Sequence, residues 1–258
     1  MYWTNFAEDR ILRTFLGSTA QAPPVVYAAL FLSNPGASGG GTEVTYPGYE
    51  RQPITFSAPS VIQGGASITN VSDILFPRSP QAAGTITFCA LADSLIGGNI
   101  WAYAALDEPI SVTADTAPLI RSAEWHYLSS GNFTNAFKAA CLNLLRGQSI
   151  TGFQPAVALF NGSPDGGGAE LSGGGYARIP IIFGAPEIQP AGQTMISNSA
   201  IATSNIATES WGTLTDDVIF DAASGGMAVA SRHRDSSVIM GRTSAASIAI
   251  GELSVSVD

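Results

Sequence analysis

Few residues of this chain could carry chemistry, because charged residues make up only 12% of its 258 residues. The most regular combination is Glu43 with Arg51, which recurs 127 positions later as Glu170 with Arg178. A carboxylate and a guanidinium at a repeated spacing indicate an ion pair. Such a pair specifies geometry more than it adds stability. We expect each pair to fix a glycine-rich loop against the strand that follows it.

Two other residue types share this repeated stretch. Tyr49 and Tyr176 precede the arginines by two positions, and Pro53 and Pro180 follow them by two. Each tyrosine could be a core aromatic with a hydrogen-bonded hydroxyl, which we favour, or a contact residue at an interface. Proline lacks an amide donor, so we expect its strand to lie at a sheet edge or to carry a bulge. Such an edge could meet another protein.

Residues for catalysis or metal binding do not recur. His126 and His233 stand at non-equivalent places in the two halves, and so do Cys89 and Cys141. Neither half therefore has enough histidines and cysteines for a histidine-based triad or a zinc site. We interpret the cysteines as small apolar core residues. We predict a protein without catalytic residues, and Arg232-His233-Arg234 is interpreted as a solvated strand or turn.

Carboxylates offer the other possible metal site. Asp216-Asp217 with Asp221, or Asp165 with Glu170, could bind calcium in a loop, but neither group has the alternating spacing of a calcium loop. The glycine-rich loops lack the Lys-Ser/Thr of a phosphate cradle. We predict no metal and no cofactor.

Composition limits the partners. The net charge is −9, with 11 basic residues and no long basic run, which argues against a nucleic-acid surface. No apolar stretch approaches the roughly 18 residues of a membrane span, and no export signal is evident. We expect neither a nucleic acid nor a membrane as partner, and production in a reducing compartment.

The chain is a tandem duplication. The stretch from Gly40 to Phe56 is repeated from Gly168 to Phe183, and other landmarks keep an offset of 127 to 130. We predict two units, unit one over residues 1–130 and unit two over 131–258, each long enough to bury its own core.

Each unit should open with a short helix and continue as short strands. Asn5 and Glu8 have the spacing of a capping box before an apolar stripe that Gly17 ends, and Thr134-Asn135 and Gly147 bound the second helix. Each stripe must pack on the following sheet or on a partner subunit. Short strands separated by glycine-rich turns predict a mainly β fold of two β-sandwich, jelly-roll-like domains. The last strand, 247–257, changes phase at Gly251-Glu252, which predicts a bulge.

The motifs resemble a family of structural proteins of tailed bacteriophages and prophages, commonly labelled tail-fibre-like. They are the run from Phe6 to Ala20, the Gly-Tyr-x-Arg-x-Pro-Ile-x-Phe stretch, and Trp211-Gly212-Thr213 followed by Asp221-Ala222-Ala223-Ser224-Gly225-Gly226. Unit one lacks the last two motifs. The resemblance implies a virion component without catalytic residues.

We therefore expect a non-enzymatic virion protein, assembled in the host cytoplasm. It would sit outside the particle as a capsid-decorating (cement) protein or as a tail- or fibre-associated protein. Its partners would be major capsid or tail proteins, and we expect a homo-oligomer. The alternative is a carbohydrate-binding module for host adhesion, with Trp101, Trp125 and Trp211 as candidate glycan contacts.

Overall fold

The computed structural model describes residues 2–62, 65–123, 126–129 and 132–257. The chain is mainly β, and the order of its elements repeats. In each half a helix is followed by strands that form one main sheet and two small ones. The prediction of a mainly β chain in two tandem units, each opened by a short helix, is confirmed.

The described residues of unit one form the first helix and ten strands. They are α1 (Asn5–Leu12) with its 3-10 extension η1 (Arg13–Leu16), and β1 (Tyr2–Trp3), β2 (Val26–Phe31), β3 (Gln52–Ile54), β4 (Ser60–Ile62), β5 (Gly65–Thr69), β6 (Ile74–Leu75), β7 (Gly84–Ala92), β8 (Ile100–Val112), β9 (Leu119–Ile120) and β10 (His126–Ser129).

Unit two repeats this plan. Its elements are α2 (Asn135–Leu144), the 3-10 turn η2 (Pro164–Gly166), and β11 (Ala156–Asn161), β12 (Ala169–Glu170), β13 (Ile179–Pro180), β14 (Glu187–Ile188), β15 (Thr194–Ser197), β16 (Ala202–Thr203), β17 (Gly212–Phe220), β18 (Ala228–Met240), β19 (Ser247–Ile248) and β20 (Ser254–Ser256).

The main sheets are antiparallel and are built around a long hairpin. In unit one the order is β1-β8-β7-β2-β3, with Leu30 opposite Cys89 at its centre. In unit two the order is β12-β11-β17-β18, and β13 also pairs with β11. Pro53 in β3 and Pro180 in β13 both lie on strands at a sheet edge, where the missing amide donor costs no ladder hydrogen bond.

The small sheets correspond as well. The sheets β10-β5-β4 and β14-β15-β20 are equivalent, as are the pairs β6-β9 and β16-β19. The prediction of one bulged strand over 247–257 is wrong. The segment forms two strands of different sheets, joined by a turn in which Gly251 adopts a φ of 75°. The change of phase marks this turn.

The two helices begin differently. In unit two, Thr134 Oγ1 accepts a hydrogen bond from Phe137 N, which caps α2. In unit one, Thr4 is the N-cap and makes no such bond. The capping box of Asn5 and Glu8 is a wrong prediction, because the Glu8 carboxylate instead accepts hydrogen bonds from Thr194 in unit two.

Each helix packs on both units. Helix α1 contacts β8 of its own main sheet and β15 of unit two. Helix α2 contacts β18 of its own unit and β4, β5 and β10 of unit one. Each helix therefore packs on the main sheet of its own unit, as expected, and also on a small sheet of the other unit.

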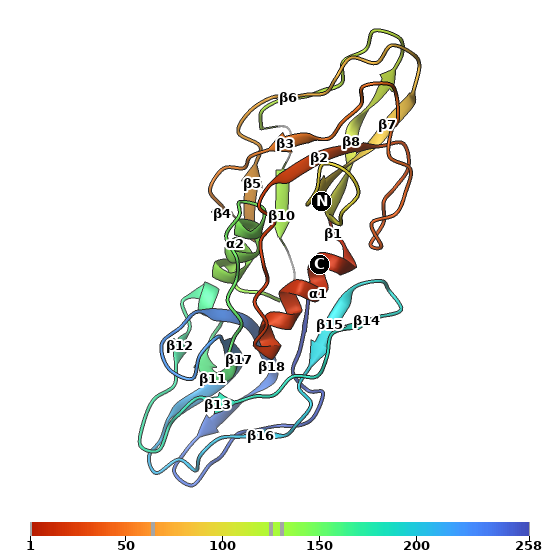
Figure 1. The fold of residues 1–258 in the computed structure, drawn as a ribbon. Coiled ribbons are helices and arrows are strands. Elements are labelled where there is room, and N and C mark those ends of the chain that lie inside the picture. Colours follow the sequence, from red (N-terminus) through yellow and green to blue (C-terminus); the bar gives the residue numbers. More distant parts are fainter. Residues whose placement is uncertain (1, 63–64, 124–125, 130–131, 258) are drawn as a thin grey trace.

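Buried apolar side chains from both units form one continuous cluster, from Trp3 to Val257. Figure 1 shows the two main sheets at opposite ends of the molecule, with the helices and both chain termini between them. Each unit is long enough to bury a core of its own, but among the described residues the two helices, each packed on both units, join the apolar side chains of both units into one cluster.

Candidate functional site

The repeated polar residues of unit one form a compact group, here called the unit-one cluster (Glu43, Tyr49 and Arg51). Arg51 donates from Nε and Nη2 to the two carboxylate oxygens of Glu43, at 2.9 and 2.8 Å. Its Nη1 donates to the carbonyls of Ser94 and Gly97, at 2.8 and 2.6 Å. Arg51 thus joins the glycine-rich loop, the segment around β3 and the turn between β7 and β8.

Tyr49 completes this cluster. Its hydroxyl donates to Glu43 Oε1 and accepts a hydrogen bond from Leu30 N, both at 3.0 Å. Leu30 lies in β2 between Ala28, which pairs with Gln52, and Phe31, which pairs with Glu43. The hydroxyl therefore satisfies a strand amide in the gap between two edge pairings.

Unit two has the same geometry in the unit-two cluster (Glu170, Tyr176 and Arg178). The bonds from Arg178 to Glu170 are 2.9 and 2.8 Å, and the Tyr176 hydroxyl lies 2.9 Å from Glu170 Oε1. The Arg178 guanidinium also lies over the ring of Phe220, 3.5 Å from its centroid, which adds a cation–π contact. Its Nη1 donates to the carbonyls of Ala222 and Gly225.

Neither cluster offers a free acid, base or nucleophile. The arginine side chains are 8% and 9% exposed and the glutamates 25% and 28%. Burial raises the pKa of both tyrosines, which keeps their hydroxyls protonated. Burial alone would raise the pKa of Glu170, but hydrogen bonds from Arg178 and Tyr176 outweigh it, and the pKa lies below its ordinary value. Each cluster can hold three segments together.

The proposed interface residues divide into two kinds. Pro53 and Pro180 are exposed on edge strands. Tyr49 and Tyr176 are half-buried, their hydroxyls are used inside the unit, and their rings contact Phe76 and Trp211, respectively. The prolines are therefore accessible to a partner, whereas the tyrosines take part in internal packing.

The paired aspartates of β17 do not share a site. Asp217 is fully buried and accepts hydrogen bonds from Arg232 and Arg234 of β18. Asp216, its neighbour in the strand, lies near the exposed ring of His233. Alternation along the strand sends the two carboxylates to opposite faces. Arg232 and Arg234, interpreted from the sequence as part of a solvated strand or turn, thus form ion pairs with the buried Asp217.

Within the described residues, no group of three His, Cys, Asp or Glu side chains is placed to hold a metal ion. Cys89 and Cys141 are both free and buried, and burial raises the pKa of each thiol. Protonated, inaccessible thiols are poor nucleophiles.

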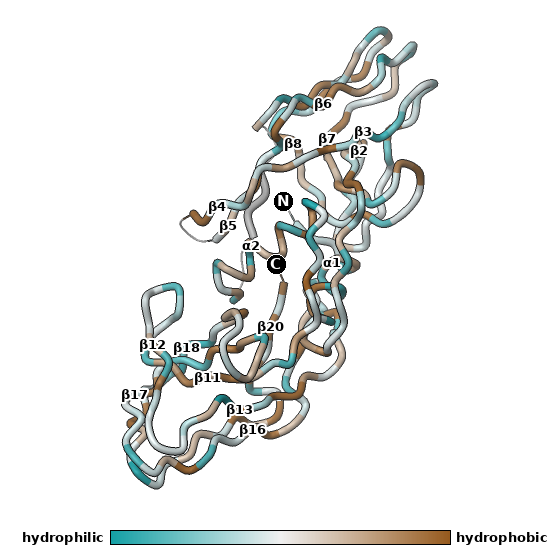
Figure 2. Tube along the Cα trace, turned by 60° about the vertical axis from the view of Figure 1, so that its left-hand side comes forward, coloured by the Kyte–Doolittle hydropathy of each residue, from teal (hydrophilic) through white to brown (hydrophobic). Residues whose placement is uncertain are grey.

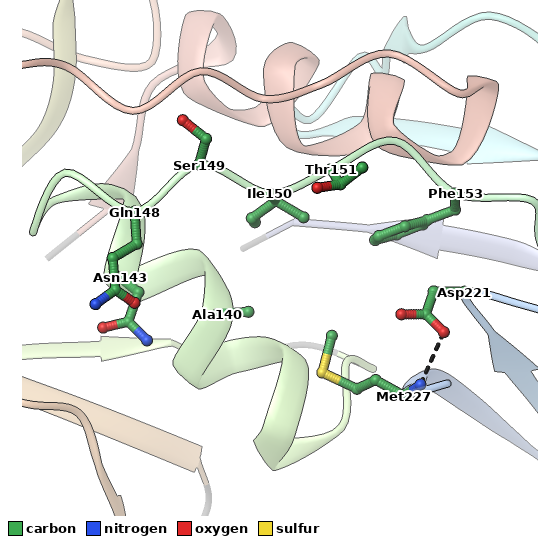
Figure 3. A pocket seen from close by; sticks show the side chains of 9 residues that line it. All are labelled: Ala140, Asn143, Gln148, Ser149, Ile150, Thr151, Phe153, Asp221 and Met227. Atoms are coloured by element: carbon green, nitrogen blue, oxygen red, sulfur yellow. Dashed lines mark hydrogen bonds between the residues drawn. The ribbon is translucent and has the colours of Figure 1, made fainter. Parts of the chain in front are cut away.

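A surface pocket of about 270 Å³ lies between α2, the segment 148–153 and the turn joining β17 to β18 (Figure 3). Asp221 faces it, but its carboxylate accepts a hydrogen bond from Met227 N within the turn. Ala140 lines the pocket where unit one has Arg10, which covers the ring of Phe6.

A family model described as podophage GP4 fiber I protein gp80 matches the chain twice, over residues 2–124 and 132–256. The chain belongs to this family. Its match over almost the whole length shows a phage structural protein of the tail-fibre type, built as a tandem duplication. No curated protein matches the chain, and no helix in the part of the chain that the structure describes is long and apolar enough to span a membrane.

One surface of this gp80-family chain was not anticipated from its sequence. Ile182, Ile201 and Ile250 are each about 65% exposed, and we call these three residues the isoleucine face. Ser199 N donates to Ile182 O, and Asn198 Nδ2 donates to the carbonyls of Ala200 and Ala249, which brings the three segments together.

Unit one has polar residues at the equivalent positions, namely Thr55, Asp73 and Ser122. There Asp73 Oδ1 accepts a hydrogen bond from Ser122 N at 2.7 Å, so two of these positions adjoin. Comparing the halves position by position would have revealed the isoleucine face, because three polar residues become three isoleucines.

Two of the tryptophans named as glycan contacts, Trp101 and Trp211, do not form an outward platform. Trp101 and Trp211 are buried, and their indole nitrogens donate to Asp93 and Gly174. Trp125 lies outside the described residues. The exposed Tyr2 packs on Tyr103 with the rings tilted by 35°, so this pair is not coplanar.

Proposed function

We propose that this chain is a non-enzymatic component of the fibre apparatus on the outside of a tailed-phage particle. Protein–protein contacts would hold it there. The observation that carries the proposal is the family match across both units. It supports a role for the whole chain, rather than for one grafted module.

The polar clusters support the absence of enzymatic activity. The polar residues that recur in both units already make hydrogen bonds within the protein. Each arginine donates to a glutamate, and each tyrosine hydroxyl accepts from a strand amide. An acid–base catalyst needs a group that can exchange a proton with a substrate. Neither cluster offers one.

The isoleucine face is the attachment surface that we propose. Figure 2 shows hydrophobic segments beside β13 and β16, next to which Ile182 and Ile201 stand in the chain. Exposed apolar residues that cluster often mark protein contacts. Because unit one is polar at the same three positions, the attachment would be specific to unit two. The occupant is an apolar surface of another protein of the fibre apparatus.

A binding experiment with particles assembled without this chain tests the proposal. The purified chain would be mixed separately with tails carrying their fibres and with empty capsids, and sedimented. We expect retention on tails. The triple variant Ile182→Thr, Ile201→Asp and Ile250→Ser, which carries unit one's residues, should bind at least tenfold more weakly, since burying each isoleucine contributes about 1.5–3 kcal/mol.

The matched control changes three apolar residues of unit one with similar exposure, Val61→Thr, Val71→Ser and Leu75→Ser. It should bind like the wild type. Retention on capsids alone would replace the fibre placement by capsid decoration. Equal binding of both triple variants would contradict the isoleucine face, and retention of the chain on a glycan column but on neither particle would favour the carbohydrate module.

A further inference from the structure

The contact between the two units is organised about a pseudo-twofold axis. Ala20 and Ile150 occupy equivalent positions of the repeat, each three residues after the glycine that ends the helical segment. They pair with each other, with Ala20 N to Ile150 O at 2.9 Å and Ile150 N to Ala20 O at 3.0 Å. Contact between a residue and its own equivalent is the mark of a self-complementary interface.

The helix contacts on either side of this axis are reciprocal. Helix α1 packs on β15 and helix α2 packs on β5, and these two strands are equivalents in the small sheets. Each unit thus supplies a helix to the other and receives one. This exchange has the form of a dimer between two chains, although a single chain makes it.

The aromatic contacts in this interface are not symmetric. Phe15 of unit one contacts four phenylalanine rings, all from unit two, with centroids 5.2 to 6.5 Å away: Phe133, Phe137, Phe153 and Phe183. The equivalents of Phe15, Phe137 and Phe153 are Leu145, Ala7 and Pro23. The cluster of five rings therefore needs one residue from unit one and four from unit two.

The polar contacts select the same pairing. Glu8 of α1 is buried and accepts hydrogen bonds from Thr194 N and Thr194 Oγ1, at 2.9 and 2.6 Å. At the equivalent positions the other helix has Lys138 and the other sheet has Ala66. Two copies of unit one would place Glu8 against Ala66, whose side chain has no donor, so the buried carboxylate would lose the hydrogen bond that Thr194 Oγ1 gives it.

We propose that the face of unit two formed by β15 and the phenylalanine cluster is a binding surface for the helix of a unit-one polypeptide, and that this binding does not depend on the covalent link between the units. The partner is specific. Unit one and unit two bind each other in preference to a second copy of themselves. The two units of the single chain therefore pair as the two different subunits of a heterodimer do.

The test uses the whole folded chain, with a specific protease site inserted between Ser130 and Gly131. After cleavage at micromolar concentration, native mass spectrometry should find a one-to-one complex of the two fragments, with the intact inserted chain as control. Separation of the fragments or their precipitation after cleavage would overturn the proposal. So would complexes of two identical fragments after the cut protein is unfolded in urea and refolded by dilution.

Two neighbouring carboxylates give a matched pair of variants. Glu8→Ala in the cut protein should weaken the complex at least tenfold, because both donors of Thr194 lose their charged acceptor. Asp9→Ala removes only the exposed pair with Arg13 and should change the dissociation constant less than about twofold. An equal effect of the two substitutions would show that Glu8 does not select the partner.

Discussion

At the scale of single residues, the two clusters show how a tandem repeat conserves geometry while its other positions change. The guanidinium of Arg51 or Arg178 bonds a carboxylate in one segment and two carbonyls in another. The fork of donors on arginine suits this task, and lysine could not reproduce it. The sequence contained enough to place both partners together, because their spacing recurs. The sequence could not show which backbone carbonyls accept hydrogen bonds from the arginines, since every residue type has a backbone carbonyl.

Arg51→Gln should destabilise the chain by about 2–4 kcal/mol, because Glu43 and two carbonyls lose a buried partner. Chemical denaturation monitored by tryptophan fluorescence would measure the difference. Arg13→Gln is the control, since Arg13 is half-exposed and pairs only along its own helical segment. It should cost no more than about 0.5 kcal/mol. Similar losses for both variants would mean that the unit-one cluster does not fix the fold.

Glu170 predicts a dependence of stability on pH. Its pKa in the folded chain lies below the ordinary 4.5, because the bonds from Arg178 and Tyr176 outweigh desolvation. A carboxyl with a lowered pKa contributes stability that is complete above its unfolded pKa and is lost as the pH falls through the folded one. Denaturation between pH 7 and pH 3 should show this loss below about pH 4.5, and Glu170→Gln should reduce the slope. An unchanged slope would contradict the assignment.

At the scale of elements, helix boundaries and strand edges could be predicted, but the neighbours of the helices could not. The apolar stripe of α1 shows which face must be covered, and it does not show what covers it. Glu8 illustrates the difficulty, because its spacing from Asn5 fits a cap and its actual partner lies 186 residues away. The turn at Gly251 was missed for a similar reason. A change of apolar phase fits either a bulge or a turn between sheets.

Phe15→Ala should lower stability by about 3–5 kcal/mol, because it leaves a cavity among the four phenylalanines of unit two. The control is Leu16→Ala at the next position, where the side chain is 40% exposed and the loss should stay below about 1 kcal/mol. Thermal unfolding by circular dichroism would compare them. Equal losses would contradict the packing of η1 against unit two.

At the scale of the whole molecule, each helix packs on both units, so we expect the tandem chain to unfold as one cooperative unit. Its core runs from Trp3 to Val257 without a boundary between the units. Calorimetry of the intact chain should therefore show a single transition, with equal calorimetric and van't Hoff enthalpies. Two resolved transitions would mean that the units unfold independently.

The same organisation leaves each main sheet and its edge strands at an end of the molecule (Figure 1). Two similar ends of different surface chemistry suit a component that attaches through one unit and presents the other. The proposed site of attachment is the isoleucine face, at which unit one is polar. The duplication and the change from polar residues to isoleucine at these three positions can be found by comparing the halves of the sequence. That the three isoleucines are exposed required the fold.

The most direct test of a position on the outer surface of the virion is immunogold electron microscopy of intact, purified phage particles. Antibodies raised against the chain would be used, and particles assembled without it would serve as the control. We expect gold on the fibre apparatus of intact particles. Absence of gold from intact particles, together with recovery of the chain only from the soluble lysate, would contradict the proposed place of this protein on the virion.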